Sequence, residues 1–88
     1  MATTARDAAA LIERYIEPSP QKPGEAEARL REHGISIWAL IEYWYGVDFD
    51  KSIVARDYDI PLEMVDAALA YYKAHKAIID ARITLATA

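Results

Sequence analysis

The sequence predicts a mainly α-helical protein with a helix-turn-helix core, a long C-terminal helix and one segment that is open to forming a short β-hairpin. Three observations lead to this fold class. Apolar residues recur at three- and four-residue spacing along most of the chain. The prolines and glycines cluster between these segments. No proline or glycine follows Pro61, so nothing in the sequence interrupts a final helix.

The length and composition indicate one small binding domain. The chain has 88 residues, and a domain of this size buries only about 60% of the surface that its unfolded form exposes. The apolar share of 53% is high for that length, and excess apolar surface usually ends in an interface. We therefore expect a homodimer or a complex with another protein.

Charge and cysteine content narrow the class of protein further. The net charge is -4 and acidic residues occur along the whole chain, which does not fit a general nucleic-acid coat or a membrane-surface helix. The absence of cysteine excludes disulfides and fits a reducing compartment. No apolar stretch resembles a signal peptide or a membrane span. We expect a cytoplasmic protein with no membrane partner.

Residues 1–22 are predicted to form an N-terminal helix and a proline-rich connector. Thr4 and Asp7 resemble a capping box, and the apolar residues that follow repeat at helical spacing, so we expect a helix over residues 4–16. Three prolines and a glycine then end the helix and favour an extended connector. Residues 23–88 are expected to form the helix-turn-helix domain.

Two structures are compatible with residues 27–37. Apolar and polar residues alternate on both sides of His33-Gly34, which is typical of a short β-hairpin. Ala, Glu and Arg in the same stretch prefer helices, so a helical turn that reaches Arg31 and is stopped by Gly34 fits as well. The next run, residues 38–45, is apolar nearly all round and predicts a buried helix ended by Gly46.

The helix-turn-helix is predicted between Lys51 and Leu69. Either Asp48 or Asp50 can cap a helix over residues 51–58. Asp59-Ile60-Pro61 forms the turn, because Asp tolerates a left-handed conformation and Pro61 suits the first turn of a second helix.

Apolar residues fall where two crossing helices need them. Ala55 is small enough for the helices to cross closely, and Ile60 can fill the space under the turn. The remaining inward positions are Val54, Tyr58, Val65 and Ala68. A plain helical hairpin would show the same apolar stripe and stays the alternative.

A DNA-binding face would come from both helices of this motif. Glu63 and Asp66 on the second helix would repel phosphate, so a monomer should bind DNA weakly, and a dimer or a complex with a basic partner should bind better. The predicted DNA-facing residues are Lys51, Ser52, Arg56, Leu62, Glu63, Asp66 and Lys73.

The final helix is predicted to reach from Leu62 to Leu85, about 35 Å. It carries two apolar stripes, and the half after His75 is expected to project beyond the helix-turn-helix. The N-terminal helix, a second copy of the chain or another protein could cover this half. The predicted partner-binding residues are Lys76, Ile79, Arg82 and Ile83.

No arrangement typical of catalysis occurs in the sequence. His33 and His75 are isolated and lack metal-ligand spacing, so we interpret both as surface or capping residues. The serines lack the glycine-flanked turn of hydrolases, and no glycine loop can hold a phosphate. We expect no catalytic, metal or cofactor site, and hence a protein that is not an enzyme.

The chain also contains a set of residues that together point to a known family. They are Val54-Ala55-Arg56-Asp57-Tyr58-Asp59-Ile60-Pro61, Val65, Ala67-Ala68-Leu69-Ala70-Tyr71-Tyr72, His75 and Ile79-Asp80-Ala81-Arg82-Ile83, preceded by Pro23-Gly24, Ala28-Arg29-Leu30 and Gly34-Ile35-Ser36-Ile37-Trp38. This set resembles the VapB-like antitoxin family, first catalogued as a bacterial domain of unknown function, over residues 23–83.

The resemblance implies a function in a toxin-antitoxin system. A member of this family would be a helix-turn-helix protein that neutralises a PIN-like ribonuclease toxin encoded beside it, and it could also bind operator DNA. The residues alone leave a second hypothesis open, which is a protein-interaction or scaffold module that does not bind DNA.

Overall fold

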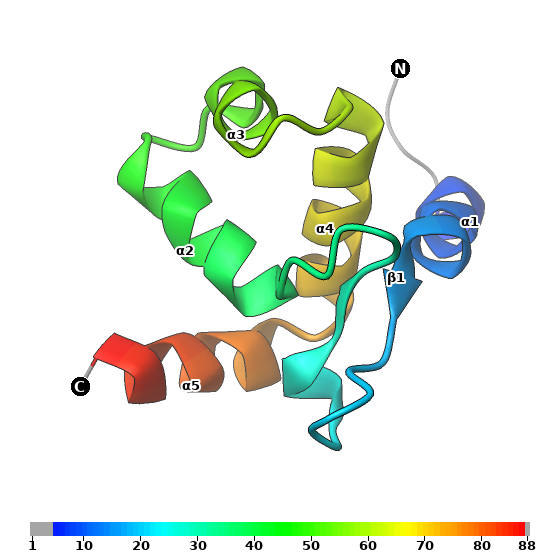
Figure 1. Ribbon diagram of the computed structural model, residues 1–88, viewed down its shortest axis with the longest axis vertical. Helices are drawn as coiled ribbons and strands as arrows, with labels where there is room; N and C mark the ends of the chain where they lie inside the picture. Colours follow the sequence, from blue (N-terminus) through cyan, green and yellow to red (C-terminus); the bar gives the residue numbers. More distant parts are fainter. Residues whose placement is uncertain (1–4, 88) are drawn as a thin grey trace.

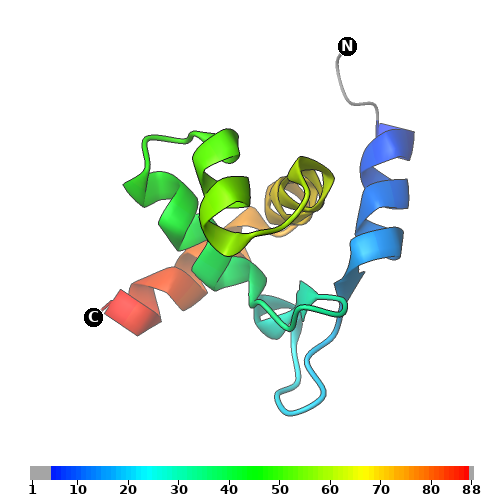
Figure 2. The same cartoon turned by 45° about the horizontal axis from the view of Figure 1, so that its top comes forward.

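Helix α4 (Leu62–Ala74) lies at the centre of the fold and the other elements pack around it. The computed structural model describes residues 5–87. Helix α1 (Ala5–Tyr15) lies on one side of α4, and helices α2 (Ile37–Gly46) and α3 (Lys51–Tyr58) lie on the other (Figures 1 and 2). Helix α5 (Lys76–Thr87) runs beneath α2 in Figure 1. The predicted mainly α-helical fold class is confirmed.

The central position of α4 follows from its residue pattern. Ala67 and Ala68 are small and fully buried, which lets neighbouring helices approach closely. Met64, Val65, Tyr71 and Tyr72 are also buried, so one broad face of the helix lies against the core. The largest fully buried side chains that surround it are Leu30, Ile37, Leu40, Ile41, Val54 and Ile79.

The N-terminal part shares this core. The predicted helix over residues 4–16 is observed as α1, which ends at Tyr15 because Ile16 belongs to strand β1 (Ile16–Glu17). Strand β1 pairs antiparallel with β2 (Arg29–Leu30), and α1 packs along α4. Thr4, the first residue of the predicted capping box, lies outside the described residues.

Of the two structures compatible with residues 27–37, the hairpin is the one observed, in minimal form. Arg29 and Ser36 form an antiparallel bridge. The Leu30 N–H donates to the Ile35 carbonyl at 2.8 Å, and the Ile37 N–H donates to the Ala28 carbonyl at 3.0 Å. A short 3-10 helix, η1 (Glu25–Glu27), precedes it. The arrangement brings the start of α2 back against β2.

The helix-turn-helix geometry agrees with its sequence signals. Asp50 caps α3: its Oδ1 accepts hydrogen bonds from the backbone of Ser52 at 2.9 Å and of Ile53 at 3.3 Å. Asp59 adopts the left-handed conformation, with φ 56° and ψ 51°. Ile60 is buried in the turn, and its N–H donates to the Ala55 carbonyl at 3.0 Å. The predicted turn is therefore confirmed.

The single helix predicted from Leu62 to Leu85 is wrong. The chain leaves helical geometry at His75, where φ is -131° and ψ is 35°, and α5 then folds back against α2 and η1. The turn buries Ile79 completely, and burying one such side chain contributes about 1.5–3 kcal/mol. The half after His75 therefore does not project. It packs against α2 and η1, whereas the sequence suggested the N-terminal helix, a second copy of the chain or another protein.

The part of the chain that the structure describes contains no helix with both the length and the apolar character to cross a bilayer.

Candidate functional site

The predicted DNA-binding face is only partly assembled. Leu62, Glu63 and Lys73 are exposed on α4, and Asp66 is half-exposed beside them. Helix α1 borders this face, because the Tyr15 hydroxyl donates a hydrogen bond to the Glu63 carboxylate. The face is therefore a strip of α4 that is narrowed on one side by α1.

Acidic partners neutralise the cations expected to hold phosphate. Lys51 Nζ lies 2.8 Å from Asp66 on α4. Arg56 Nε lies 2.9 Å from Asp57, and the Tyr43 hydroxyl donates to the same carboxylate from α2. These two hydrogen bonds lower the pKa of Asp57, the one from Tyr43 more strongly. Asp57 thus connects Arg56 with Tyr43 of α2.

The other two predicted DNA-facing side chains that can donate a hydrogen bond to phosphate are those of Ser52 and Lys73. Ser52 is exposed on α3. Lys73 is exposed on α4 and, among residues 5–87, has no ion-pair partner. A single unpaired cation contributes little to phosphate binding, which scales with the number of phosphates neutralised.

The predicted partner-binding residues do not form one exposed surface. Ile79 is fully buried and is a core residue, so this part of the prediction is corrected. Arg82 bonds Glu27 at 2.7 Å and stacks over the Trp38 ring at 4.2 Å, and Ile83 is half-buried against the core. Lys76 is exposed but bonds Asp80 at 2.7 Å. The exposed apolar residues of α5 are instead Ile78 and Leu85.

A hydrogen-bonded chain ties α5 to the rest of the fold. The hydroxyls of Tyr45 and Tyr72 bond each other, and the Tyr72 hydroxyl donates to Asp80 at 2.7 Å. Burial, followed by these two hydrogen bonds, raises the pKa of Tyr72. The hydrogen bond from Lys76, followed by that from Tyr72, lowers the pKa of Asp80. The chain links α2, α4 and α5 and has a structural role.

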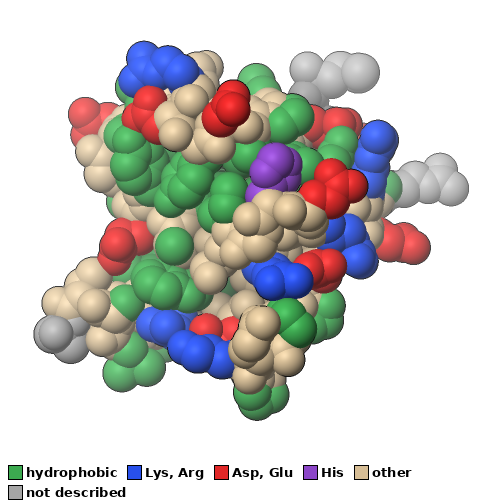
Figure 3. Space-filling view, viewed as in Figure 1, with side chains coloured by type: hydrophobic (Ala, Val, Ile, Leu, Met, Phe, Trp, Pro, Cys, Tyr) green, Lys and Arg blue, Asp and Glu red, His purple; other side chains and the backbone are tan. Residues whose placement is uncertain are grey.

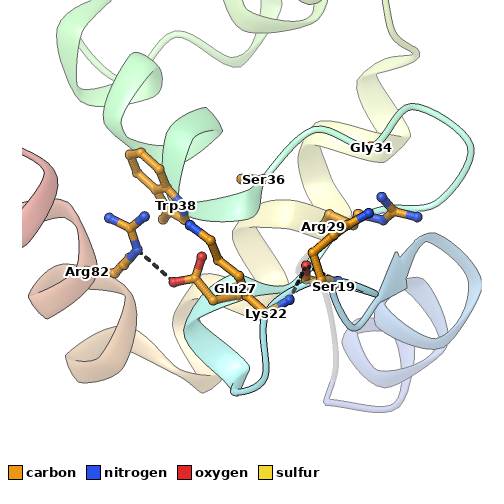
Figure 4. Close-up of a pocket in the computed structure, with 9 residues that line it drawn as sticks. Ser19, Lys22, Glu27, Arg29, Gly34, Ser36, Trp38 and Arg82 are labelled. Atoms are coloured by element: carbon orange, nitrogen blue, oxygen red, sulfur yellow. Dashed lines mark hydrogen bonds and ion pairs between the residues drawn. The ribbon is translucent and has the colours of Figure 1, made fainter.

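A polar pocket of about 220 Å³ lies where α5, η1 and the hairpin meet (Figure 4). The ion pair between Arg82 and Glu27 crosses it, next to the Trp38 ring, while Arg29 enters from the other end. Arg29 Nε lies 2.7 Å from Glu17. Because glutamates neutralise both guanidinium groups, the pocket is best described as a junction that fixes α5.

A larger groove runs between α2 and α3. We call it the α2–α3 groove; its volume is about 410 Å³, and it is lined by Trp38, Ala39, Glu42, Tyr43, Gly46, Val47 and Tyr58. The rings of Tyr43 and Tyr58 meet edge to face with centroids 5.4 Å apart. Figure 3 shows hydrophobic side chains gathered over this side of the molecule, with acidic side chains at the edges.

Glu42 is the unusual residue of the α2–α3 groove. Its Oε2 is buried and accepts no hydrogen bond from any described residue. Burial, and then the charge of Glu42, raise the pKa of the Tyr58 hydroxyl. Sequence reasoning missed this site. The available signal was one acidic residue inside the otherwise apolar run of residues 38–45.

Exposed aromatic side chains also lie at the C-terminal end of α2, apart from the residues that line the groove. Tyr45 is 39% exposed and Phe49, in the loop before α3, is 56% exposed. The Phe49 ring lies edge-on to both Trp44 and Tyr45, with centroids 4.9 and 5.3 Å away. The two exposed rings that contact each other form what we call the aromatic surface: Tyr45 and Phe49.

Within residues 5–87 no group of three or more His, Asp or Glu is arranged to hold a metal ion. No family model, no curated protein and no solved structure matches this chain. The resemblance to VapB-like antitoxins therefore rests on the residues quoted for it.

Proposed function

We propose that this chain is a non-catalytic protein-binding antitoxin whose partner is a PIN-like ribonuclease toxin. The aromatic surface is the observation that carries the proposal. Tyr is enriched at the energetically dominant positions of protein interfaces, and large apolar side chains exposed together mark interaction sites. The choice of a toxin as the partner follows from the resemblance of residues 23–83 to antitoxins.

The backbone at Phe49 supports a binding role for this surface. Asp48 and Phe49 have φ values of 56° and 64°, in the left-handed region that bulky side chains rarely adopt. Backbone strain of this kind is often retained at functional sites. Here it accompanies a phenylalanine ring that stays more than half exposed, so the loop presents apolar surface instead of burying it.

Co-expression with the product of the neighbouring gene tests the proposal. We expect that product alone to slow growth, and this chain to relieve the defect and to purify with it. Replacing Tyr45 and Phe49 by Ala should abolish both effects while circular dichroism stays unchanged, a check that is needed because the Tyr45 hydroxyl also bonds Tyr72. Leu62→Ala is the matched control, because Leu62 is 45% exposed but lies on α4 outside the aromatic surface. Equal rescue by the double variant and the control would contradict the proposal.

Operator DNA is a second candidate ligand, favoured by the helix-turn-helix itself. The internal ion pairs of Lys51 and Arg56 argue that the chain alone binds DNA weakly. A homodimer would place two copies of α4 on one duplex and double the number of phosphate contacts. Salt-dependent binding to the upstream DNA that Arg56→Ala and Lys73→Ala weaken would support this candidate.

A protein-interaction or scaffold module without DNA binding is the remaining function compatible with the aromatic surface. It would bind a partner through the same side chains, but the partner would not be toxic and rescue would be absent.

A further inference from the structure

The buried Oε2 atom of Glu42 has no hydrogen-bond donor among residues 5–87. A buried charged acceptor without a donor is costly, and each such group in a native protein calls for a physical explanation, of which a bound ligand is one. Glu42 as a whole is half-buried and lines the α2–α3 groove, so a short rotation of its side chain can present the carboxylate to a ligand there. The missing partner must supply hydrogen-bond donors, and positive charge would suit it best.

The remaining walls of the groove also suit a cation. Trp38 and Tyr58 supply aromatic rings, and the negative face of an aromatic ring attracts a cation within about 6 Å. The protein already uses this interaction once, since the Arg82 guanidinium stacks over the Trp38 ring at 4.2 Å. A carboxylate next to aromatic rings is a combination that recognises a cation through both charge and ring faces.

The chain does not fill the groove with a cation of its own. Arg82 stacks on the Trp38 ring but its Nε bonds Glu27, Arg56 Nε bonds Asp57, and the buried Glu42 Oε2 accepts from no residue among 5–87. Gly46 leaves one end of the groove open, because a side chain added there would meet no atom within 4 Å. A long side chain from another molecule therefore has a route to Glu42.

We propose that the α2–α3 groove binds an arginine side chain of the protein partner, with the guanidinium on the Glu42 carboxylate and against the Trp38 and Tyr58 rings. Arginine fits better than lysine, because a planar guanidinium stacks on rings and bonds a carboxylate through two N–H groups at once. The identity of the occupant as a partner's side chain rests on the proposed protein-binding function, whereas the site itself does not.

Titration of the full chain with methylguanidinium chloride tests the site without any partner. We expect saturable NMR shifts at the Trp38 indole and the Tyr58 ring, with an affinity on the order of millimolar. N-methylurea, a neutral probe of similar shape, should produce none. Glu42→Gln should weaken binding by about tenfold or more, since it removes the charge and keeps the shape. Glu63→Gln removes a carboxylate from α4 and should change nothing.

A second variant keeps the test valid if Glu42→Gln alters the fold. Gly46→Leu places a side chain in open space at the end of the groove and should block methylguanidinium while circular dichroism stays unchanged. No saturable shift in the wild type, or equal shifts with both probes, overturns the site.

Capture of the neighbouring gene product tests the arginine contact and the proposed protein-binding function separately. If the wild type retains the neighbouring gene product and Glu42→Gln retains it equally, the arginine contact is wrong while the proposed function stands. If the wild type retains no partner, the proposed function fails, and a positive methylguanidinium titration still supports the site. Weaker capture by both Glu42→Gln and Gly46→Leu supports the inference as a whole.

Discussion

Asp50 illustrates how one residue sets the start of a helix. The sequence offered Asp48 and Asp50 as equal candidates for the cap of α3. Asp48 takes a left-handed φ of 56°, whereas Asp50 is extended and accepts two backbone N–H groups. Only an extended residue can occupy the position before the first helical turn. Sequence chemistry therefore predicted the residue type, and the course of the preceding loop selected the position.

The cap gives a prediction at the residue scale. Asp50→Ala should lower the free energy of unfolding by about 1 kcal/mol, because two backbone N–H groups lose their acceptor. Asp50→Asn should retain most of the stability, since Asn caps helices nearly as well. Urea unfolding followed by circular dichroism measures both variants. Equal losses for Ala and Asn would show that the carboxylate charge, and not the capping geometry, is what matters.

Glu42 shows what single-residue reasoning could not see. In the sequence it was one acidic position in an apolar helix, and such residues usually face solvent. In the folded chain it lines a groove together with Tyr58 of α3, whose hydroxyl feels the charge of Glu42. No local pattern encodes that approach, so the groove could be found only from the folded chain.

At the scale of elements, the boundaries of α1, α2 and α3 followed closely from helical periodicity and capping residues, whereas the break between α4 and α5 did not. Residues 62–85 contain no proline or glycine, so local propensity favours one helix. The break occurs at His75, which stacks on Tyr71 and lies 2.6 Å from the carboxylate of Glu25. Tertiary packing overrode propensity there.

The fold-back of α5 predicts opposite outcomes for two neighbouring isoleucines. Ile79→Ala should destabilise the protein by about 2–5 kcal/mol, because Ile79 is fully buried against the core. Ile78→Ala should change stability by less than about 0.5 kcal/mol, because Ile78 is 43% exposed. Thermal unfolding of both variants gives the comparison. Similar losses at both positions would mean that α5 does not pack as described.

The contacts of Asp80 predict a pH dependence for the same element. Its pKa is lowered from 3.8 in the folded chain, so the unfolded chain takes up the proton first as pH falls. The stabilisation is therefore complete above about pH 4 and is lost as pH falls through the lowered folded pKa.

Asp80→Asn measures this contribution. Since the ion pair with Lys76 is largely exposed, the variant should lose about 0.5–1 kcal/mol at pH 7 and differ little from the wild type near pH 2. Urea unfolding at both pH values provides the test. A loss of the same size at pH 2 would contradict an electrostatic origin.

At the scale of the whole molecule, the chain is compact without a partner. Its radius of gyration is 12.1 Å, and about 12 Å is expected for a folded domain of this length. Neither Tyr45 nor Phe49 belongs to its hydrophobic core, and Tyr45 contacts the rest of the fold through its bond to Tyr72. The aromatic surface is available for binding, which agrees with the apolar excess noted in the composition and supports an interface role.

The distribution of charge bears on which of the two candidate ligands, a protein or operator DNA, the chain binds. The net charge is -4, and the cations nearest the helix-turn-helix face are largely held by acidic neighbours. Composition alone predicted weak DNA binding, but it could not show which cations are paired, because the pair of Lys51 with Asp66 forms only when α3 packs on α4, and the Arg56–Asp57 pair depends on side-chain geometry. The whole molecule is better suited to a protein surface than to phosphate.

One side-by-side measurement tests whether the primary ligand of this chain is a protein. The purified chain is titrated into the product of the neighbouring gene and, separately, into its own upstream DNA at 50 and 200 mM salt. We expect a stable protein complex, disrupted by Ala at Tyr45 and Phe49, together with weak DNA binding that fades at the higher salt. Tight, sequence-specific DNA binding with no complex formed would contradict it.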